Sequence, residues 1–205
     1  MLFQLLAAFS LATGAAAPAN AQDNDPNENA CAVKSGAERI AGCTAWMESR
    51  KLDDADAKAA FNIRGSTYLA EKDYARAVAD FSDWIRLAPK DAMAYLSRAD
   101  AYTLKGDYAL AIADYGVVIR VDPSVLNAFN NRAWSYYRLK EYSRAVSDYD
   151  TVIQRDPRNV QALYIRGLAE GKLGHSEASK ADIARAIALD PNIANRFAKA
   201  TGPIN

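Results

Sequence analysis

Histidine and cysteine are scarce in this chain: its 205 residues include one histidine, His175, and two cysteines, Cys31 and Cys43. No set of metal ligands can be assembled from so few at the spacings that metal sites use. The sequence also lacks a nucleophile elbow, a phosphate-binding loop and a dinucleotide-binding fingerprint. We therefore expect a protein that is not an enzyme and needs no metal or cofactor, with His175 as a solvated side chain in a polar turn.

An excess of charge of either sign is also missing. The 25 Lys and Arg residues balance 25 Asp and Glu residues, and the formal net charge is zero. Such a balance gives no long-range attraction to nucleic acid or to anionic lipid, so we expect neither as a partner. Half of the residues are hydrophobic. The chain can therefore bury a substantial core.

The sequence has no apolar run long enough for a membrane anchor, which needs about 20 residues. The apolar stretch Leu2–Ala12 is shorter, and small residues follow it up to Ala21. This pattern predicts a signal peptide over residues 1–21, and a periplasmic or secreted protein that is not inserted in a membrane after cleavage. The alternative is an Ala-rich tail on a cytosolic protein. Residues 22–33 are polar and Asn-rich and are predicted to form a flexible linker.

A sequence period of 34 residues organises the rest of the chain. Within each copy the apolar positions step by three and four, as one face of an α-helix requires. A proline then ends the second helix of each copy, because it cannot continue the hydrogen-bond ladder. Each copy therefore predicts a pair of antiparallel helices. The recurring positions include the prolines Pro89, Pro123, Pro157 and Pro191, the small residues Gly65, Ala99, Ala133 and Gly167, and the aromatics Tyr68, Tyr102 and Tyr136.

The period, the small and aromatic positions and the closing proline resemble the tetratricopeptide repeat family, in an exported bacterial form. The resemblance implies an all-α, right-handed α-solenoid of four helix-turn-helix repeats, at residues 58–91, 92–125, 126–159 and 160–193. Ala37–Met47 aligns with Ala75–Ile85, so we expect a degenerate capping half-repeat with one helix over residues 34–57. Residues 194–205 are predicted to be a short C-terminal cap or tail.

The resemblance also implies a non-catalytic scaffold or adaptor whose first helices line a concave groove. We expect the groove to bind an extended peptide or a helix of another protein, because amides can pair with peptide backbone and aromatic rings can anchor it. The alternatives are a solenoid that self-associates into homo-oligomers and an accessory subunit of a separate enzyme. For the Trp134 and Tyr137 side chains, the alternative is packing against the next repeat. The groove residues carried over from the resemblance are Asn62, Leu69, Met93, Leu96, Asp100, Asn127, Asn130, Asn131, Trp134, Tyr137, Gln161 and Tyr164.

One ligand of the family is not expected here. The clamp that holds acidic C-terminal tails needs Lys and Arg at defined groove positions. This chain has Asn62, Asn127 and Asn131 there.

Arginine and aspartate recur in register, with each Arg followed by an Asp sixteen residues later. We interpret them as charge-assisted bonds between the two helices of a repeat. The alternative is a basic ladder for an anionic partner. The predicted pairs are Arg64–Asp80, Arg98–Asp114, Arg132–Asp148 and Arg166–Asp182.

The two cysteines, Cys31 and Cys43, lie twelve positions apart in a chain that we predict to be exported. A disulfide between them would tie the linker to the capping helix and restrict the unfolded chain. The alternative is two unpaired thiols.

Overall fold

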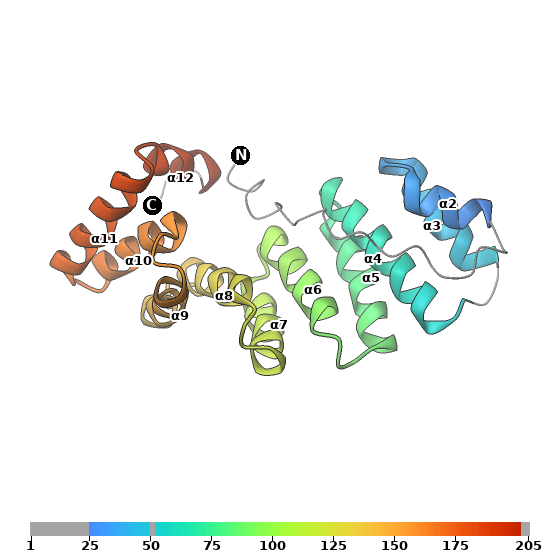
Figure 1. Cartoon of the computed structure of the whole chain (residues 1–205), viewed down its shortest axis with the longest axis horizontal. Helices are drawn as coiled ribbons and strands as arrows, with labels where there is room; N and C mark the ends of the chain where they lie inside the picture. Colours follow the sequence, from blue (N-terminus) through green and yellow to red (C-terminus); the bar gives the residue numbers. More distant parts are fainter. Residues whose placement is uncertain (1–24, 50–51, 202–205) are drawn as a thin grey trace. The chain divides into compact units, whose positions relative to one another are not determined.

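The computed structural model describes residues 25–49 and 52–201, and within these ranges the chain forms helices and no strands (Figure 1). The predicted signal peptide, the first residues of the predicted linker and residues 202–205 lie outside the described residues. None of the described helices is both long enough and apolar enough to cross a membrane. The helices are α2 (Pro26–Val33), α3 (Gly36–Ser49), α4 (Asp54–Ala70), α5 (Tyr74–Leu87), α6 (Ala92–Lys105), α7 (Tyr108–Val121), α8 (Leu126–Arg138), α9 (Tyr142–Arg155), α10 (Val160–Lys172), α11 (Ser176–Leu189) and α12 (Ile193–Thr201).

The helices belong to two compact units, with α2–α8 in the first unit and α9–α12 in the second. Within each unit every helix packs against the next one along the chain, so that consecutive helix pairs stack. The first unit shows this stacking from the blue α2–α3 pair to the yellow-green α8 (Figure 1). The boundary between the units falls after Leu139, in the turn between the two helices of the third repeat. The predicted all-α fold of paired helices is confirmed.

Local sequence sets the ends of these helices. Asp73 and Asp91 precede α5 and α6, and each side chain accepts a hydrogen bond from a backbone N–H in the first turn. Such caps satisfy donors that have no partner inside the helix. Gly106 ends α6 in the left-handed conformation, with φ of 94°. Glycine adopts this conformation without steric cost, which lets the chain turn back at once.

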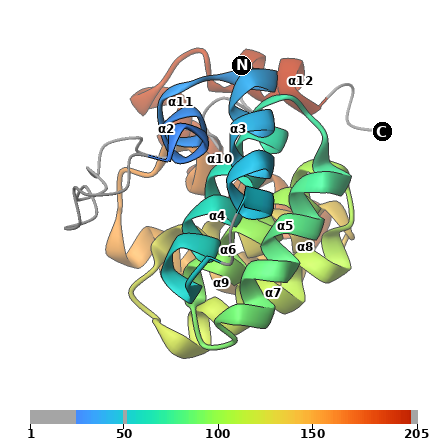
Figure 2. The same ribbon diagram turned by 90° about the vertical axis from the view of Figure 1, so that its right-hand side faces the viewer.

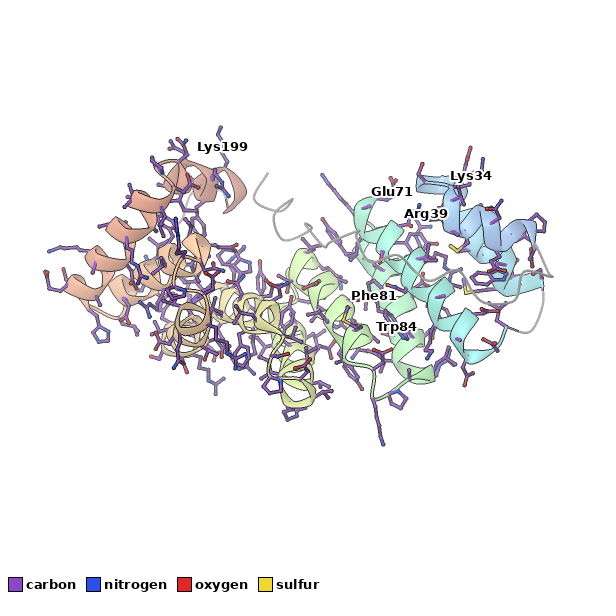
Figure 3. All side chains as sticks on the ribbon, viewed as in Figure 1. Lys34, Arg39, Glu71, Phe81, Trp84 and Lys199 are labelled. Atoms are coloured by element: carbon purple, nitrogen blue, oxygen red, sulfur yellow. A yellow bond between two sulfur atoms is a disulfide. The ribbon has the colours of Figure 1, made fainter. Side chains whose placement is uncertain are left out.

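Small residues at fixed positions allow neighbouring helices to approach closely. A Cβ atom at Gly65 of α4 would lie 2.7 Å from the ring of Phe81 on α5. Phe81 and Trp84 lie in a buried cluster with Ala94 and Ala101 of the next repeat (Figure 3). The core is therefore shared between these two adjacent repeats, and the α4–α5 pair buries its apolar face against α6.

The N-terminal end of the first unit is a pair of helices, and the prediction of a flexible linker is wrong for Pro26–Val33, which form α2. The side chain of Asp25 caps this helix, Pro26 occupies its first turn, and Cys31 forms a disulfide with Cys43 of α3. Figure 2 views the chain from the end that α2 and α3 form. The cap therefore has two helices, where a half-repeat with one helix was predicted.

The other repeat boundaries differ little from those predicted. Helix α4 begins at Asp54, four residues before the predicted start of the first repeat. At the C-terminal end, α12 covers residues 194–201 of the predicted cap or tail, and its Ile193 and Phe197 side chains are buried. The Phe197 ring meets the edge of Tyr164 on α10 at a centroid distance of 5.3 Å. This contact covers the last repeat with an apolar helix face.

Candidate functional site

The predicted groove residues lie on the first helices of the repeats, α4, α6, α8 and α10. In the first unit α6 contacts both α4 and α8 directly. We call the face along which these three helices meet the first-helix side. Gln161 and Tyr164 lie on α10 in the second unit. Their membership of the same groove stays a prediction.

Exposure divides the candidates into three groups. Asn62, Met93 and Asn127 are exposed, with 43 % of Met93 accessible to solvent. Leu69, Asp100, Asn130 and Gln161 are half-buried. The buried candidates are Leu96, Asn131, Trp134, Tyr137 and Tyr164.

A polar network centred on Asp100 links two successive first helices. Asn131 of α8 donates from Nδ2 to Asp100 Oδ1 of α6 at 3.0 Å. The Tyr115 hydroxyl of α7 donates to the same oxygen at 2.6 Å and lies 3.1 Å from Thr103 Oγ1. Asn130 donates to Asn131 Oδ1 at 3.3 Å. Side chains from α7 and α8 thus converge on one carboxylate of α6.

The surroundings of this network change the proton affinity of two groups. Burial raises the pKa of the Asp100 carboxyl from 3.8 to about 6, although the hydrogen bonds from Tyr115 and Asn131 favour its ionised form and lower the pKa. Burial and the neighbouring Asp100 carboxylate raise the pKa of the Tyr115 hydroxyl well above its ordinary value. Tyr115 therefore remains a neutral donor near neutral pH, while Asp100 carries a negative charge.

The raised pKa of Asp100 predicts a pH-dependent stability. Between about pH 4 and pH 6 the folded chain holds a proton that the unfolded chain has released, so the free energy of unfolding falls as the pH rises. The wild type should lose about 1–2 kcal/mol relative to Asp100→Asn across this window. Urea unfolding of both proteins at a series of pH values measures the difference. Parallel curves for the two proteins would contradict the burial of this charge.

Aromatic rings pack beside the network on α8. The Trp134 and Tyr137 rings stack with their centroids 5.7 Å apart, and both side chains are buried. The Arg138 guanidinium lies over Trp134 at 5.3 Å and over Tyr108 of α7 at 4.9 Å. Burial of the two stacked rings favours a packing role for them over a role as exposed anchors.

Three of the four predicted arginine–aspartate pairs lie within single units, and the structure contains all three. Arg98 donates from Nε and Nη2 to the two carboxylate oxygens of Asp114, at 2.7 and 2.9 Å. Arg64–Asp80 and Arg166–Asp182 have the same two-bond geometry. Arg132 and Asp148 belong to different units. Their pairing stays a prediction.

Each of these three arginines also bonds to a second helix of the preceding pair, which the sequence analysis missed. Nη1 of Arg98 donates to Ser82 Oγ at 3.1 Å, and Nη1 of Arg166 donates to Asp150 Oδ1 at 2.6 Å. Arg64 donates in the same way to Thr44 of α3 at 2.9 Å. The arginines therefore join consecutive repeats as well as the two helices of one repeat. Ser82 and Asp150 each precede their arginine by sixteen residues. This constant spacing could have predicted the contacts from the sequence.

The lone histidine contacts one carboxylate of its own repeat. Nδ1 of His175 lies 2.5 Å from Glu170 Oε2, and the imidazole ring is exposed. Within the described residues no three His, Cys, Asp or Glu side chains gather as metal ligands would.

Family models identify the repeats that the geometry displays. Three models described as tetratricopeptide repeat match this chain, at residues 48–92 and 64–124, at residues 126–159 and at residues 160–193. The chain belongs to the tetratricopeptide repeat family. No curated protein sequence matches it significantly.

Solved structures of other tetratricopeptide repeat proteins share the fold. MamA from Desulfovibrio magneticus RS-1, solved from its residue 41 to its end, superposes with a TM-score of 0.68 at 17% identity, covering 76% of this chain and 86% of that chain. YrrB, described as a TPR protein with an unusual peptide-binding site, also has a TM-score of 0.68, at 16% identity over 79% of this chain and 81% of YrrB. The second TPR domain of human RPAP3, solved with an HSP70 peptide, has a TM-score of 0.55 at 25% identity over 58% of this chain and 98% of that domain.

Proposed function

We propose that this protein is a non-catalytic scaffold that binds an extended peptide or a helix of another protein along its first-helix side. The observation that carries the proposal is the hydrogen bond between Asn131 and Asp100, which joins polar side chains of successive first helices into one network. Exposed Asn62 and Asn127 lie on helices of the same side. Such amides can donate to and accept from a peptide backbone. The peptide complex of the RPAP3 domain and the peptide-binding site described for YrrB, both proteins with this fold, support the proposal by analogy.

A buried hydrogen-bond acceptor on α8 also supports peptide binding. Asn130 Oδ1 is buried and accepts no hydrogen bond within the described residues, although Nδ2 of the same amide donates to Asn131. A buried acceptor without a hydrogen bond lowers the free energy of unfolding by about 1–3 kcal/mol. Rotation of the Asn130 side chain toward an arriving peptide N–H would satisfy it. The ligand that fits best therefore presents hydrogen-bond donors. This preference agrees with the asparagines that stand where a clamp for acidic tails needs lysine and arginine.

The test begins with selection of binding peptides from a displayed library on the immobilised mature protein. Titration calorimetry then compares one selected peptide on the wild type, Asn130→Ala and Asp100→Asn. We expect each variant to bind about tenfold more weakly, since Asn130→Ala removes the acceptor and Asp100→Asn alters the network that positions Asn131 beside it. Asn195→Ala is the matched control, because Asn195 is exposed on α12 in the second unit. Wild-type affinity in both variants, or equal weakening in the control, would place binding elsewhere.

We also propose that the chain is exported, with cleavage after Ala21. The disulfide between Cys31 and Cys43 supports an oxidising compartment. The intact mass of protein taken from its native compartment should correspond to a chain that begins at Gln22. Reduction should then add the mass of two hydrogens. A retained Met1 or free thiols would contradict export.

A further inference from the structure

Arg138, the last residue of α8, is an exposed cation on the first-helix side. It follows Asn131 by seven positions and Asn127 by eleven, and this spacing places all three residues on one face of the helix. Asn131 on that face donates a hydrogen bond to Asp100 of the neighbouring first helix α6. Arg138 therefore lies at the C-terminal end of the α8 face that carries the proposed binding network.

Two aromatic rings hold the Arg138 guanidinium in place. It lies over the Trp134 ring at 5.3 Å and over the Tyr108 ring of α7 at 4.9 Å. Among the residues that the structure describes, no side chain or backbone group forms a hydrogen bond or an ion pair with it. A ring attracts the positive charge but supplies no oxygen acceptor for the N–H donors. These donors are therefore available to an acceptor from a partner.

Arg76 of α5 shows how such a cation is completed within the same unit. Its guanidinium lies over the Tyr68 ring at 4.4 Å, and Nε donates to Asp73 Oδ2 at 2.6 Å. One exposed guanidinium can thus keep a ring contact and bind a carboxylate at the same time. Arg138 has the ring contacts and lacks the carboxylate.

The acidic residues close to these groups in the sequence already have partners. Asp107, which precedes the first residue of α7, pairs with Lys105 at 2.6 Å. Glu141, three residues after Arg138, pairs with Arg144 at 2.8 Å. A carboxylate for Arg138 would therefore come from outside the chain.

We infer that Arg138 binds a carboxylate of the peptide that the first-helix side holds. The inference rests on the proposed function and adds an acidic group to the ligand. Guanidinium N–H donors match the two oxygens of a carboxylate, and the ring contacts fix the guanidinium before the ligand arrives. Arg138 is separate from the clamp for acidic tails, whose positions hold Asn62, Asn127 and Asn131 in this chain.

The position of Arg138 also sets a spacing within the ligand. Eight positions of α8 separate it from Asn130, whose buried Oδ1 is the acceptor offered to a peptide N–H. At about 1.5 Å per residue, this separation is about 12 Å along the helix. An extended peptide needs about four residues to cover that distance. We therefore expect the carboxylate about four residues or more from the N–H that Asn130 accepts.

The experiment selects peptides from a displayed library on the immobilised wild type and, separately, on Arg138→Gln. Asp or Glu should be enriched at one position of the peptides from the wild type and not of those from the variant. Titration calorimetry then compares one wild-type peptide with a copy whose acidic residue is replaced by its amide. The amide should bind the wild type about tenfold more weakly, and Arg138→Gln less than about twofold more weakly.

Arg120→Gln is the matched control, because Arg120 is an exposed arginine of α7 and its loss changes the net charge equally. It should distinguish the two peptides as the wild type does, and circular dichroism checks that both variants keep their helices. Peptides with free and with amidated C-termini separate a terminal carboxylate from an acidic side chain.

Two failures are distinguishable. Selected peptides that bind the wild type and Arg138→Gln equally well would overturn this inference and leave the proposed function in place. Failure to select any peptide on the wild type would overturn both.

Discussion

Replacing Arg98 by alanine should lower the free energy of unfolding by about 2–4 kcal/mol. The Asp114 side chain is only 8% exposed and receives hydrogen bonds from Arg98 on both of its oxygens. Without Arg98 the carboxylate stays largely buried with no cation beside it, and the Ser82 hydroxyl loses its link to the next repeat. Urea unfolding followed by circular dichroism measures the loss.

Two comparisons isolate this effect. Arg86→Ala removes an arginine whose ion pair with Asp83 is exposed, and should change the stability by less than about 1 kcal/mol. In a double-mutant cycle, Arg98→Ala combined with Asp114→Ala should cost about 1–3 kcal/mol less than the sum of the single changes. A coupling energy near zero would show that the pair does not hold the repeats together.

Gly42→Ala should destabilise the N-terminal cap by about 1–3 kcal/mol. A Cβ at this position of α3 would lie 2.7 Å from backbone atoms of Ala30 and Cys31 on α2. The backbone cannot rotate away as a side chain can, and the disulfide between Cys31 and Cys43 holds α2 against α3. The added methyl group must therefore push the two helices apart. Urea unfolding of the oxidised protein measures this cost.

The matched control is Gly116→Ala, a glycine inside a helix of the same length. Its Cβ would meet no atom closer than 3.7 Å. This change should leave stability unchanged or raise it by up to about 1 kcal/mol, because alanine favours helix more than glycine does. If Gly42→Ala and Gly116→Ala change the free energy of unfolding equally, the close approach of α2 to Gly42 does not limit the stability of the cap.

The 34-residue period was enough to predict the helix pairs, because each helix must bury an apolar face against its neighbours. Helix α2 escaped prediction because it lies outside the repeat period and begins within a polar, Asn-rich stretch. Its stability depends on the Asp25 cap, on Pro26 in the first turn and on the bond from Cys31 to Cys43. These supports come from positions that no repeat pattern displays.

The candidate site was predicted less completely than the fold. The resemblance placed the candidates on the first helices of the repeats, but it could not show that Asn131, Trp134 and Tyr137 are buried. The decisive contact joins Asp100 to a residue 31 positions later, across two repeats. Such contacts depend on how adjacent repeats stack. Neither the composition of the sequence nor its 34-residue period determines that stacking.

The central claim is that a partner protein binds the first-helix side, and site-specific photo-crosslinking in the native organism tests it most directly. A photoreactive residue replaces Asn127, which is exposed on α8, or Ala79, which is exposed on the second helix α5. We predict a discrete adduct with another protein from position 127 and none from position 79. Adducts from position 79 alone, or adducts only with a second copy of this chain, would contradict the claim.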